Sequence, residues 1–141
     1  MIPRDAVEAD LPVLARILGD WAADTPWMPR LHSRKDDLGF LRRLYHSGCL
    51  RVIGDAPQGF LARQDTEIPA LFVAAPAQRR GVGKALIRDA MAAAPVLQLW
   101  TFQANTPARA FYLSLAFVET ERTDGSGNEE RLPDVRLEWR R

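Results

Sequence analysis

The stretch AAPAQRRGVGKALI, residues 74–87, decides the fold of this chain. An apolar run, residues 70–73, leads into it and a helical pattern of apolar residues follows it, so we expect it to join a strand to a helix. The turn between them combines two glycines with Arg79, Arg80 and Lys84. Such a turn points backbone N–H groups and a helix N-terminus at one place, which favours phosphate oxygens. We therefore expect a pyrophosphate-binding site here.

The spacing of the two glycines argues against two common phosphate-binding motifs. A Walker A loop has Gly, four residues and then Gly-Lys-Ser/Thr, but here Gln78 stands at the first Gly position and Ala85 follows Gly83-Lys84. A Rossmann fingerprint has a third small residue three positions after Gly83, where this chain has Leu86. The pattern that remains is Gln-x-x-Gly-x-Gly at residues 78–83, directly after a strand.

Composition favours one globular domain. The chain has 141 residues, of which 47% are hydrophobic and 26% charged, enough for one core and too few for two domains. Its 19 basic and 18 acidic residues give a net charge of +1, so it lacks the basic excess of a nucleic-acid-binding protein. The single cysteine, Cys49, argues against an intrachain disulfide or a cysteine-rich zinc site. No apolar signal segment and no run of about 18 apolar residues is present, so we expect a cytoplasmic protein without a membrane partner.

Periodicity predicts the first part of the fold. Apolar residues recur at helical spacing over 11–21 and again over 38–45. Ser33 and Asp36 have the spacing of a capping box before the second helix, and two prolines make residues 24–32 a loop. Alternating and apolar runs at 49–53, 60–63 and 68–73 then predict an antiparallel meander.

The second part begins with a strand, a helix and a strand within about 30 residues, which predicts a βαβ crossover. The helix after the Gly turn ends before Pro95, and the buried strand 96–100 is expected to run parallel to the strand before that helix. Thr106 and Pro107 predict the start of the last helix, with Thr106 as its N-cap. Residues 117–121 and 135–139 are expected to be the final strands, joined by a polar, Gly-rich connection.

Two motifs resemble those of the GCN5-related N-acetyltransferase (GNAT) superfamily. Residues 78–83 resemble its acyl-CoA signature, and Asn105 to Tyr112 resembles its Asn…Ala-x-x-Phe-Tyr segment. Leu115-Ala116-Phe117 resembles its Leu-Gly-Phe ending, with Ala116 in place of Gly; in a left-handed helix end this Ala would be strained by roughly 1 kcal/mol.

The order of predicted elements matches that family along nearly the whole chain. The resemblance implies an α/β (α+β) GNAT fold: a central, mixed but mostly antiparallel sheet of about six to seven strands, flanked by about four helices, in one domain over residues 1–141.

The resemblance also implies acetyl-CoA as cosubstrate, without a metal. In the family the Gly turn holds the CoA pyrophosphate, amides of the preceding strand polarise the thioester carbonyl, and the Asn contacts the pantetheine arm. The cofactor-binding residues implied are Leu71, Phe72, Val73, Gln78, Arg79, Arg80, Gly81, Val82, Gly83, Lys84, Asn105, Arg109 and Tyr112.

Two residues are candidates for proton transfer. The Tyr112 phenol is the candidate general acid for the leaving thiolate; the alternative is a core tyrosine packed beside Phe111. Glu67 stands fourteen residues before Gly81, where the histone acetyltransferase branch has a strand glutamate that deprotonates the amine through water. Glu67 is therefore the candidate base; the alternatives are an exposed turn glutamate and a water chain as base.

Loop 24–32 is the expected acceptor side, with Trp27, Met28 and Arg30 as substrate-binding candidates; alternatively, Trp27 fills the core. The function implied is transfer of an acetyl group from acetyl-CoA to a primary amine of a small molecule or peptide, by direct attack in a ternary complex. The alternative is a non-catalytic acyl-CoA-binding or protein-interaction module on the same fold. A homodimer is possible, with an interface at Trp100, Phe102 and Trp139, which are equally suited to the core.

Overall fold

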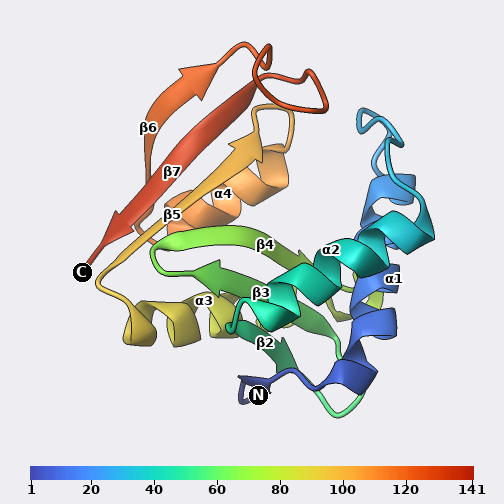
Figure 1. Cartoon of the computed structure of the whole chain (residues 1–141). Helices are drawn as coiled ribbons and strands as arrows, with labels where there is room; N and C mark the ends of the chain where they lie inside the picture. The colour runs from blue at the N-terminus through green and yellow to red at the C-terminus, as the bar shows by residue number, and fades with distance from the viewer.

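The computed structural model describes all 141 residues, and its centre is one seven-stranded sheet of order β1-β2-β3-β4-β5-β7-β6. Every strand pair is antiparallel except β4 with β5. Four α-helices and two short 3-10 helices complete the fold (Figure 1). In chain order the elements are β1 (Arg4–Asp5), η1 (Glu8–Asp10), α1 (Leu11–Asp24), α2 (Arg34–His46), β2 (Leu50–Ile53), β3 (Gly59–Gln64), β4 (Glu67–Val73), η2 (Ala75–Ala77), α3 (Val82–Ala93), β5 (Val96–Phe102), α4 (Thr106–Ser114), β6 (Val118–Thr123) and β7 (Asp134–Arg140).

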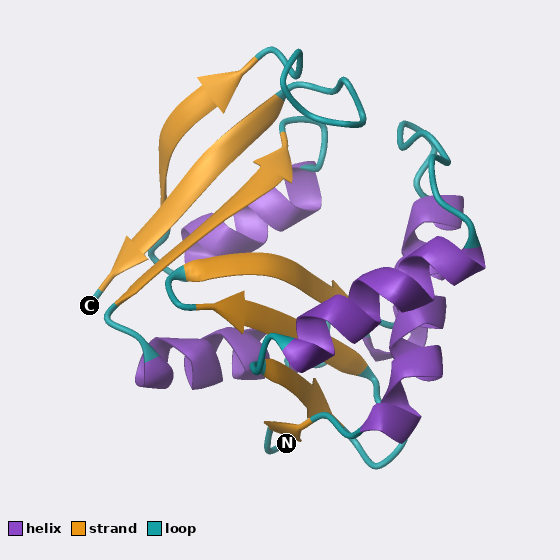
Figure 2. Ribbon diagram, in the orientation of Figure 1, coloured by secondary structure: helices purple, strands orange, loops and turns teal.

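Helices cover the sheet unequally. α1 and α2 pack on one face of β2 to β4, over a core that includes Leu14, Leu41 and Phe60. α3 and α4 lie on the opposite face, over a core that includes Leu86 and Leu97. On the α1/α2 side, β5, β7 and β6 carry no helix (Figure 2). One half of that sheet face is therefore open beside a helical wall.

A β-bulge in β4 reverses which face its side chains point to. The register pairs Ala62 with Ala70 but Gln64 with Glu67, so three steps along β4 oppose two along β3. As a result, Ile68 belongs to the core under α3 while Ala70, two residues on, belongs to the core under α1 and α2. Pro69 lies within the bulge, where a strand tolerates a residue without an N–H group.

β4 and β5 are paired only at one end. Their parallel register consists of Glu67 opposite Gln98, and Figure 1 shows the two strands separating towards their carboxyl ends. β4 stays paired with β3 as far as Val73, and β5 stays paired with β7 as far as Phe102. The sheet is therefore split between two continuous halves, and the split opens toward the start of α3.

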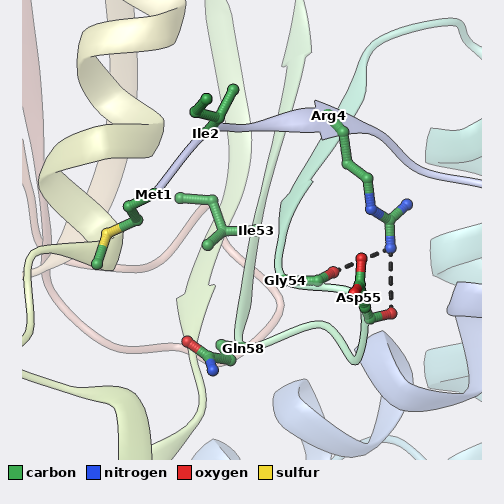
Figure 3. A pocket seen from close by; sticks show the side chains of 7 residues that line it. All are labelled: Met1, Ile2, Arg4, Ile53, Gly54, Asp55 and Gln58. Atoms are coloured by element: carbon green, nitrogen blue, oxygen red, sulfur yellow. Dashed lines mark hydrogen bonds between the residues drawn. The ribbon is translucent and has the colours of Figure 1, made fainter.

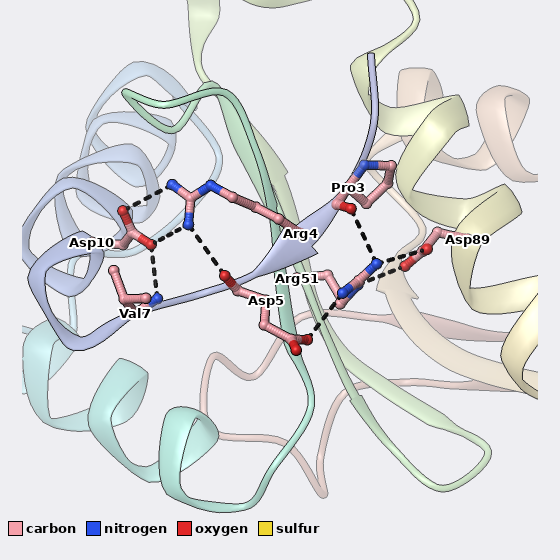
Figure 4. A network of polar contacts seen from close by, with 7 residues as sticks. All are labelled: Pro3, Arg4, Asp5, Val7, Asp10, Arg51 and Asp89. Carbon is pink, nitrogen blue, oxygen red and sulfur yellow. Dashed lines mark hydrogen bonds and ion pairs between the residues drawn. The ribbon is translucent and has the colours of Figure 1, made fainter.

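Ion pairs hold α3 and the N-terminal segment against β2 (Figure 4). The Arg51 guanidinium donates to both Asp89 carboxylate oxygens, at 2.9 and 3.1 Å, and to Asp5 at 2.9 Å. Arg4 donates to Asp10 at 2.9 Å, and this contact lowers the pKa of the Asp10 carboxyl below its usual value. Of these pairs, Arg51–Asp89 joins β2 to α3, and the others hold the N-terminal segment.

Most predicted elements are confirmed, including the Ser33–Asp36 capping box and the parallel β4–β5 pair. The N-cap of α4 is a correction: Asn105, rather than Thr106, caps this helix, because its side-chain oxygen accepts from the Ala108 N–H at 3.2 Å. Ala116 has φ +68°, so the strained left-handed residue after α4 is present as expected.

Candidate active site

The N-terminus of α3 is an open nest of backbone donors. Its N-cap is Gly81, which has φ +87° and no side chain to accept a hydrogen bond. The N–H groups of Gly81, Val82, Gly83 and Lys84 have no partner in the protein. A Cβ on Gly81 would meet no atom within 4 Å. Free donors, a positive helix end and open space together fit phosphate oxygens.

Positive side chains surround this nest without partners. Arg79, Arg80 and Lys84 are exposed, and none of them forms an ion pair. Arg79 has φ +63°, the left-handed conformation that turns successive amides inward. Three unpaired positive side chains beside free backbone donors favour the binding of an anion here.

The open edge of β4 supplies further donors. The Ala74 N–H donates to the Gln58 carbonyl on the β3 side, so by alternation the Phe72 N–H also faces β3. The Leu71 and Val73 N–H groups then face the β4–β5 gap, where no strand pairs with them. Gln78 Nε2 donates to the Val73 carbonyl at 3.2 Å and ties the Gly turn to this edge.

The gap narrows where α3 meets α4. A Cβ on Gly83 would lie 3.2 Å from Phe111 Cζ and 3.7 Å from Val73 Cγ2. Glycine at this position therefore allows the first turn of α3 to lie against α4. Because Gly83 has no side chain, none projects from this position into the space between the start of α3 and β4.

Tyr112 lies in the core on the α3/α4 side of the gap. It is 7% exposed, and its ring packs edge-on against Phe111 and Phe117. Burial raises the pKa of its phenol above the ordinary value. The hydroxyl has no hydrogen-bond partner in the protein, and no buried polar side-chain atom is left unpaired, so the hydroxyl reaches an accessible space. At neutral pH this phenol therefore keeps its proton.

Glu67 lies at the closed end of the gap, on the opposite face from Tyr112. Its side chain is 43% exposed and pairs with Arg136 of β7, whose Nη1 lies 2.9 Å from Glu67 Oε2. The neighbouring Ile68 points into the core under α3, so Glu67 points toward the open sheet face. The two candidate proton-transfer residues thus flank the split sheet from its two sides.

An aromatic wall stands beside the open face. Trp27 contacts Trp21 of α1 and Phe102 at the end of β5, with ring centroids 6.0 and 5.7 Å apart. Trp21 in turn contacts Phe72 of β4 at 5.4 Å. We call Trp21, Trp27, Phe72 and Phe102 the aromatic wall; it connects β4 with β5 across the split. Trp27 packs against other aromatic rings and remains partly exposed.

Of the residues expected to contact cofactor or substrate, two already form hydrogen bonds within the protein and one is exposed. Asn105 uses its oxygen to cap α4, and Arg109 donates to Glu119 at 2.8 Å and to the Gln103 carbonyl at 3.1 Å. Arg30 is exposed in the α1–α2 loop. A role of Asn105 or Arg109 with a cofactor, and of Met28 or Arg30 with a substrate, stays a prediction.

A separate hollow of about 430 Å³ lies at the β1 edge of the sheet, bounded by Met1, Ile2 and Ile53 (Figure 3). The Arg4 side chain there donates to the carbonyl groups of Gly54 and Asp55. In the sheet order, β3 and β4 separate the β1–β2 edge from β5.

Sequence reasoning missed the residues that shape the closed end of the gap: Arg136, Gln98 and the bulge at Pro69. A proline inside an apolar strand was the available signal for the bulge. No sequence pattern pointed to Arg136, because its position beside Glu67 depends on how β7 pairs with β5. The three aromatic residues suggested for an interface or the core have three different environments. Trp100 is 42% exposed, Phe102 joins the aromatic wall and Trp139 packs on the core.

Comparison with known proteins defines the class. Residues 15–117 match the model of the acetyltransferase (GNAT) family, and the chain belongs to this family. It is an N-acetyltransferase of the acyl-CoA-dependent type. None of its helices is long and apolar enough to cross a membrane.

Individual relatives agree with this assignment. The chain is 28% identical to the peptidyl-lysine N-acetyltransferase YiaC of Escherichia coli K12 over 96% of its own length and 94% of that of YiaC. Its fold matches a ribosomal-protein-alanine N-acetyltransferase from Brucella melitensis with a TM-score of 0.80, at 20% identity and full coverage of both chains. It also matches YncA from Salmonella typhimurium, solved with its cofactor acetyl-CoA, with a TM-score of 0.75, at 17% identity over 99% of this chain and 93% of YncA.

Proposed function

We propose that this acetyltransferase acts on amines carried by polypeptides, with a lysine side chain as the acceptor. The observation that carries the proposal is the open face of β5, β7 and β6, which no helix covers on the α1/α2 side (Figure 2). Trp100 of β5 is 42% exposed. An extended peptide needs such a long uncovered surface, whereas a small amine would be served by a closed pocket. The whole-length similarity to a peptidyl-lysine N-acetyltransferase supports the same acceptor class.

The α3 nest would hold the pyrophosphate of acetyl-CoA. Gly81, Val82, Gly83 and Lys84 offer their N–H groups, and Arg79 and Arg80 offer charge. Leu71 and Val73 would donate their N–H groups to the extended arm and to the carbonyl oxygen that becomes negative during attack. When bound, acetyl-CoA supplies the activated acetyl carbon and a thiolate leaving group.

Proton transfer would take place from both sides of the sheet. On the open face, Glu67 takes a proton from the incoming ammonium group, directly or through water, so that a neutral amine is present to attack. The nitrogen–carbon bond forms and the carbon–sulfur bond breaks. On the α3/α4 side, Tyr112 gives its proton to the departing sulfur. The second proton of the attacking nitrogen passes to water, and Tyr112 regains a proton from water. Trp27 and the aromatic wall would contact the apolar part of the acceptor.

The deciding experiment offers acetyl-CoA together with three acceptors: a peptide with one internal lysine and a blocked N-terminus, a peptide with a free N-terminal alanine and no lysine, and free lysine. Release of CoA and acetylation of the peptide are measured. Faster turnover of the internal-lysine peptide supports the proposal. Preference for the alanine peptide or for free lysine rejects it, and no turnover of any amine would favour the non-catalytic module.

A further inference from the structure

One arginine joins the two halves of the split sheet at its closed end. Arg136 of β7 donates to Glu67 Oε2 through Nη1 at 2.9 Å, and its Nη2 contacts Glu67 Oε1. The same Nη2 donates to Gln98 Oε1 of β5 at 3.1 Å. Arg136 thus contacts β4 and β5 from β7, at the single register position where β4 and β5 still pair.

The surroundings of Arg136 keep it in this place. Gln98 Nε2 donates to Glu138 Oε2 at 2.9 Å, which leaves the Gln98 oxygen directed at Arg136. The Arg136 guanidinium lies 5.3 Å from the centre of the Trp100 ring. Glu121 of β6 and Glu138 of β7 are the other charged groups facing it, and Arg140 pairs with Glu138. The Arg136 side chain is accordingly only 15% exposed.

Glu67 remains available despite the pairing. A carboxylate has about four acceptor positions on two oxygens, and Arg136 uses one on each oxygen. Glu67 is 43% exposed, nearly three times as much as Arg136. The unused positions are therefore the accessible ones, and they face the open surface on which an acceptor would lie.

We propose that Arg136 is a positioning residue for the acceptor amine, acting through Glu67. This inference rests on the proposed function of Glu67. Arg136 holds both carboxylate oxygens in one orientation, so the free positions point at the incoming ammonium group and receive its proton. The bidentate fork of arginine achieves this, whereas a lysine at the same position offers one point of charge.

The test is a double-mutant cycle on acetyl transfer to a lysine peptide. Glu67→Gln should lower kcat/KM by about 10²-fold, the range of a lost general base. Arg136→Gln alone should lower it about 10-fold or more and should move the pH–rate profile, with partial recovery in Arg136→Lys. In the Glu67→Gln background, Arg136→Gln should cause no further loss. Arg122→Gln is the matched control, because it removes an arginine of β6 that contacts Glu119 and not Glu67. Additive losses, or an unmoved pH profile in Arg136→Gln, would overturn the inference.

A second measurement does not depend on turnover. In NMR spectra, the Arg136 guanidinium N–H signals should be resolved in the wild type and lost to exchange in Glu67→Gln. Saturation with a lysine peptide in the presence of CoA should shift these signals, and an unmoved spectrum would also reject the inference. If no amine is acetylated by the wild type, the proposed function fails, while the NMR result still decides whether an acceptor reaches the Arg136–Glu67 pair.

Discussion

α3 and α4 begin on the same side of the split sheet, and their N-termini are built in different ways. α4 is closed by the Asn105 side chain, which accepts from the Ala108 N–H. α3 begins at Gly81, which has no side chain, and its first amides are left without partners. An unsatisfied helix start costs stability unless water or a ligand provides acceptors. The difference supports the proposal that the N-terminus of α3 binds a ligand, whereas the N-terminus of α4 is closed by the protein itself.

The largest effect is expected from closing the α3 end. Gly81→Asp adds a carboxylate to the nest, where it competes with a phosphate for the same amides. Saturating acetyl-CoA at about 100 times its Kd should stabilise the wild type by about 2.7 kcal/mol, and this gain should disappear in the variant. Thermal unfolding with and without acetyl-CoA measures it.

Gly48→Asp is the matched control for that variant. Gly48 also has positive φ, +109°, and a Cβ there meets nothing within 4 Å. Both variants should lose about 1 kcal/mol of intrinsic stability, but Gly48→Asp should keep the response to acetyl-CoA. Equal responses in the two variants would mean that the open end of α3 binds no phosphate.

The next effect concerns α4 and turnover. Tyr112→Phe removes the hydroxyl and keeps the buried ring, so the core and acetyl-CoA affinity should be retained. Loss of a general acid should lower kcat by about 10²-fold. Tyr45→Phe on α2 is the control, since that ring lies in the other core. Steady-state kinetics with a lysine peptide separate kcat from KM, and an unchanged kcat would remove Tyr112 from the acid role.

A smaller effect is expected at the α4 cap. Asn105→Ala leaves the Ala108 N–H without its acceptor and should lower the free energy of unfolding by about 1 kcal/mol. Denaturant unfolding without ligand measures this cost. Asn105→Asp keeps the cap and should show no such loss. If Asn105→Ala is as stable as the wild type, α4 does not depend on this cap.

The smallest effect is a gain. Ala116 follows α4 in the left-handed region, at φ +68°, where glycine has no steric penalty. Ala116→Gly should raise the free energy of unfolding by a few tenths to about 1 kcal/mol. Ala110→Gly, at an exposed position inside α4, should instead lower it by a similar amount. The sign of the change at Ala116 is the informative result in denaturant unfolding.

The sequence predicts the parts of the fold that depend on local spacing. The Gly turn before α3, the Ser33 capping box and the alternation of the meander are local patterns, and all three are present. The crossover from β4 through α3 to β5 follows from strand–helix–strand order, because such connections join parallel strands.

The features that the sequence did not predict depend on pairing between distant strands. The unpaired N–H groups of Leu71 and Val73 follow from a bulge and from the divergence of β5, neither of which is a periodic signal. The Arg136–Glu67 contact joins residues 69 positions apart. Trp27 was assigned to the acceptor side from its loop, but the rings that it meets come from α1 and β5.

The free edge of β4 has a consequence for hydrogen exchange. By strand order β4 lies in the middle of the sheet, and its amides would ordinarily be among the last to exchange with solvent. The Leu71 and Val73 amides nevertheless lack a hydrogen-bonded neighbouring strand, and we expect them to exchange fast. An extended ligand arm bound there would stand in for the missing strand. β4 therefore offers the unpaired backbone groups of an edge strand, although the outer edges of the sheet are β1 and β6.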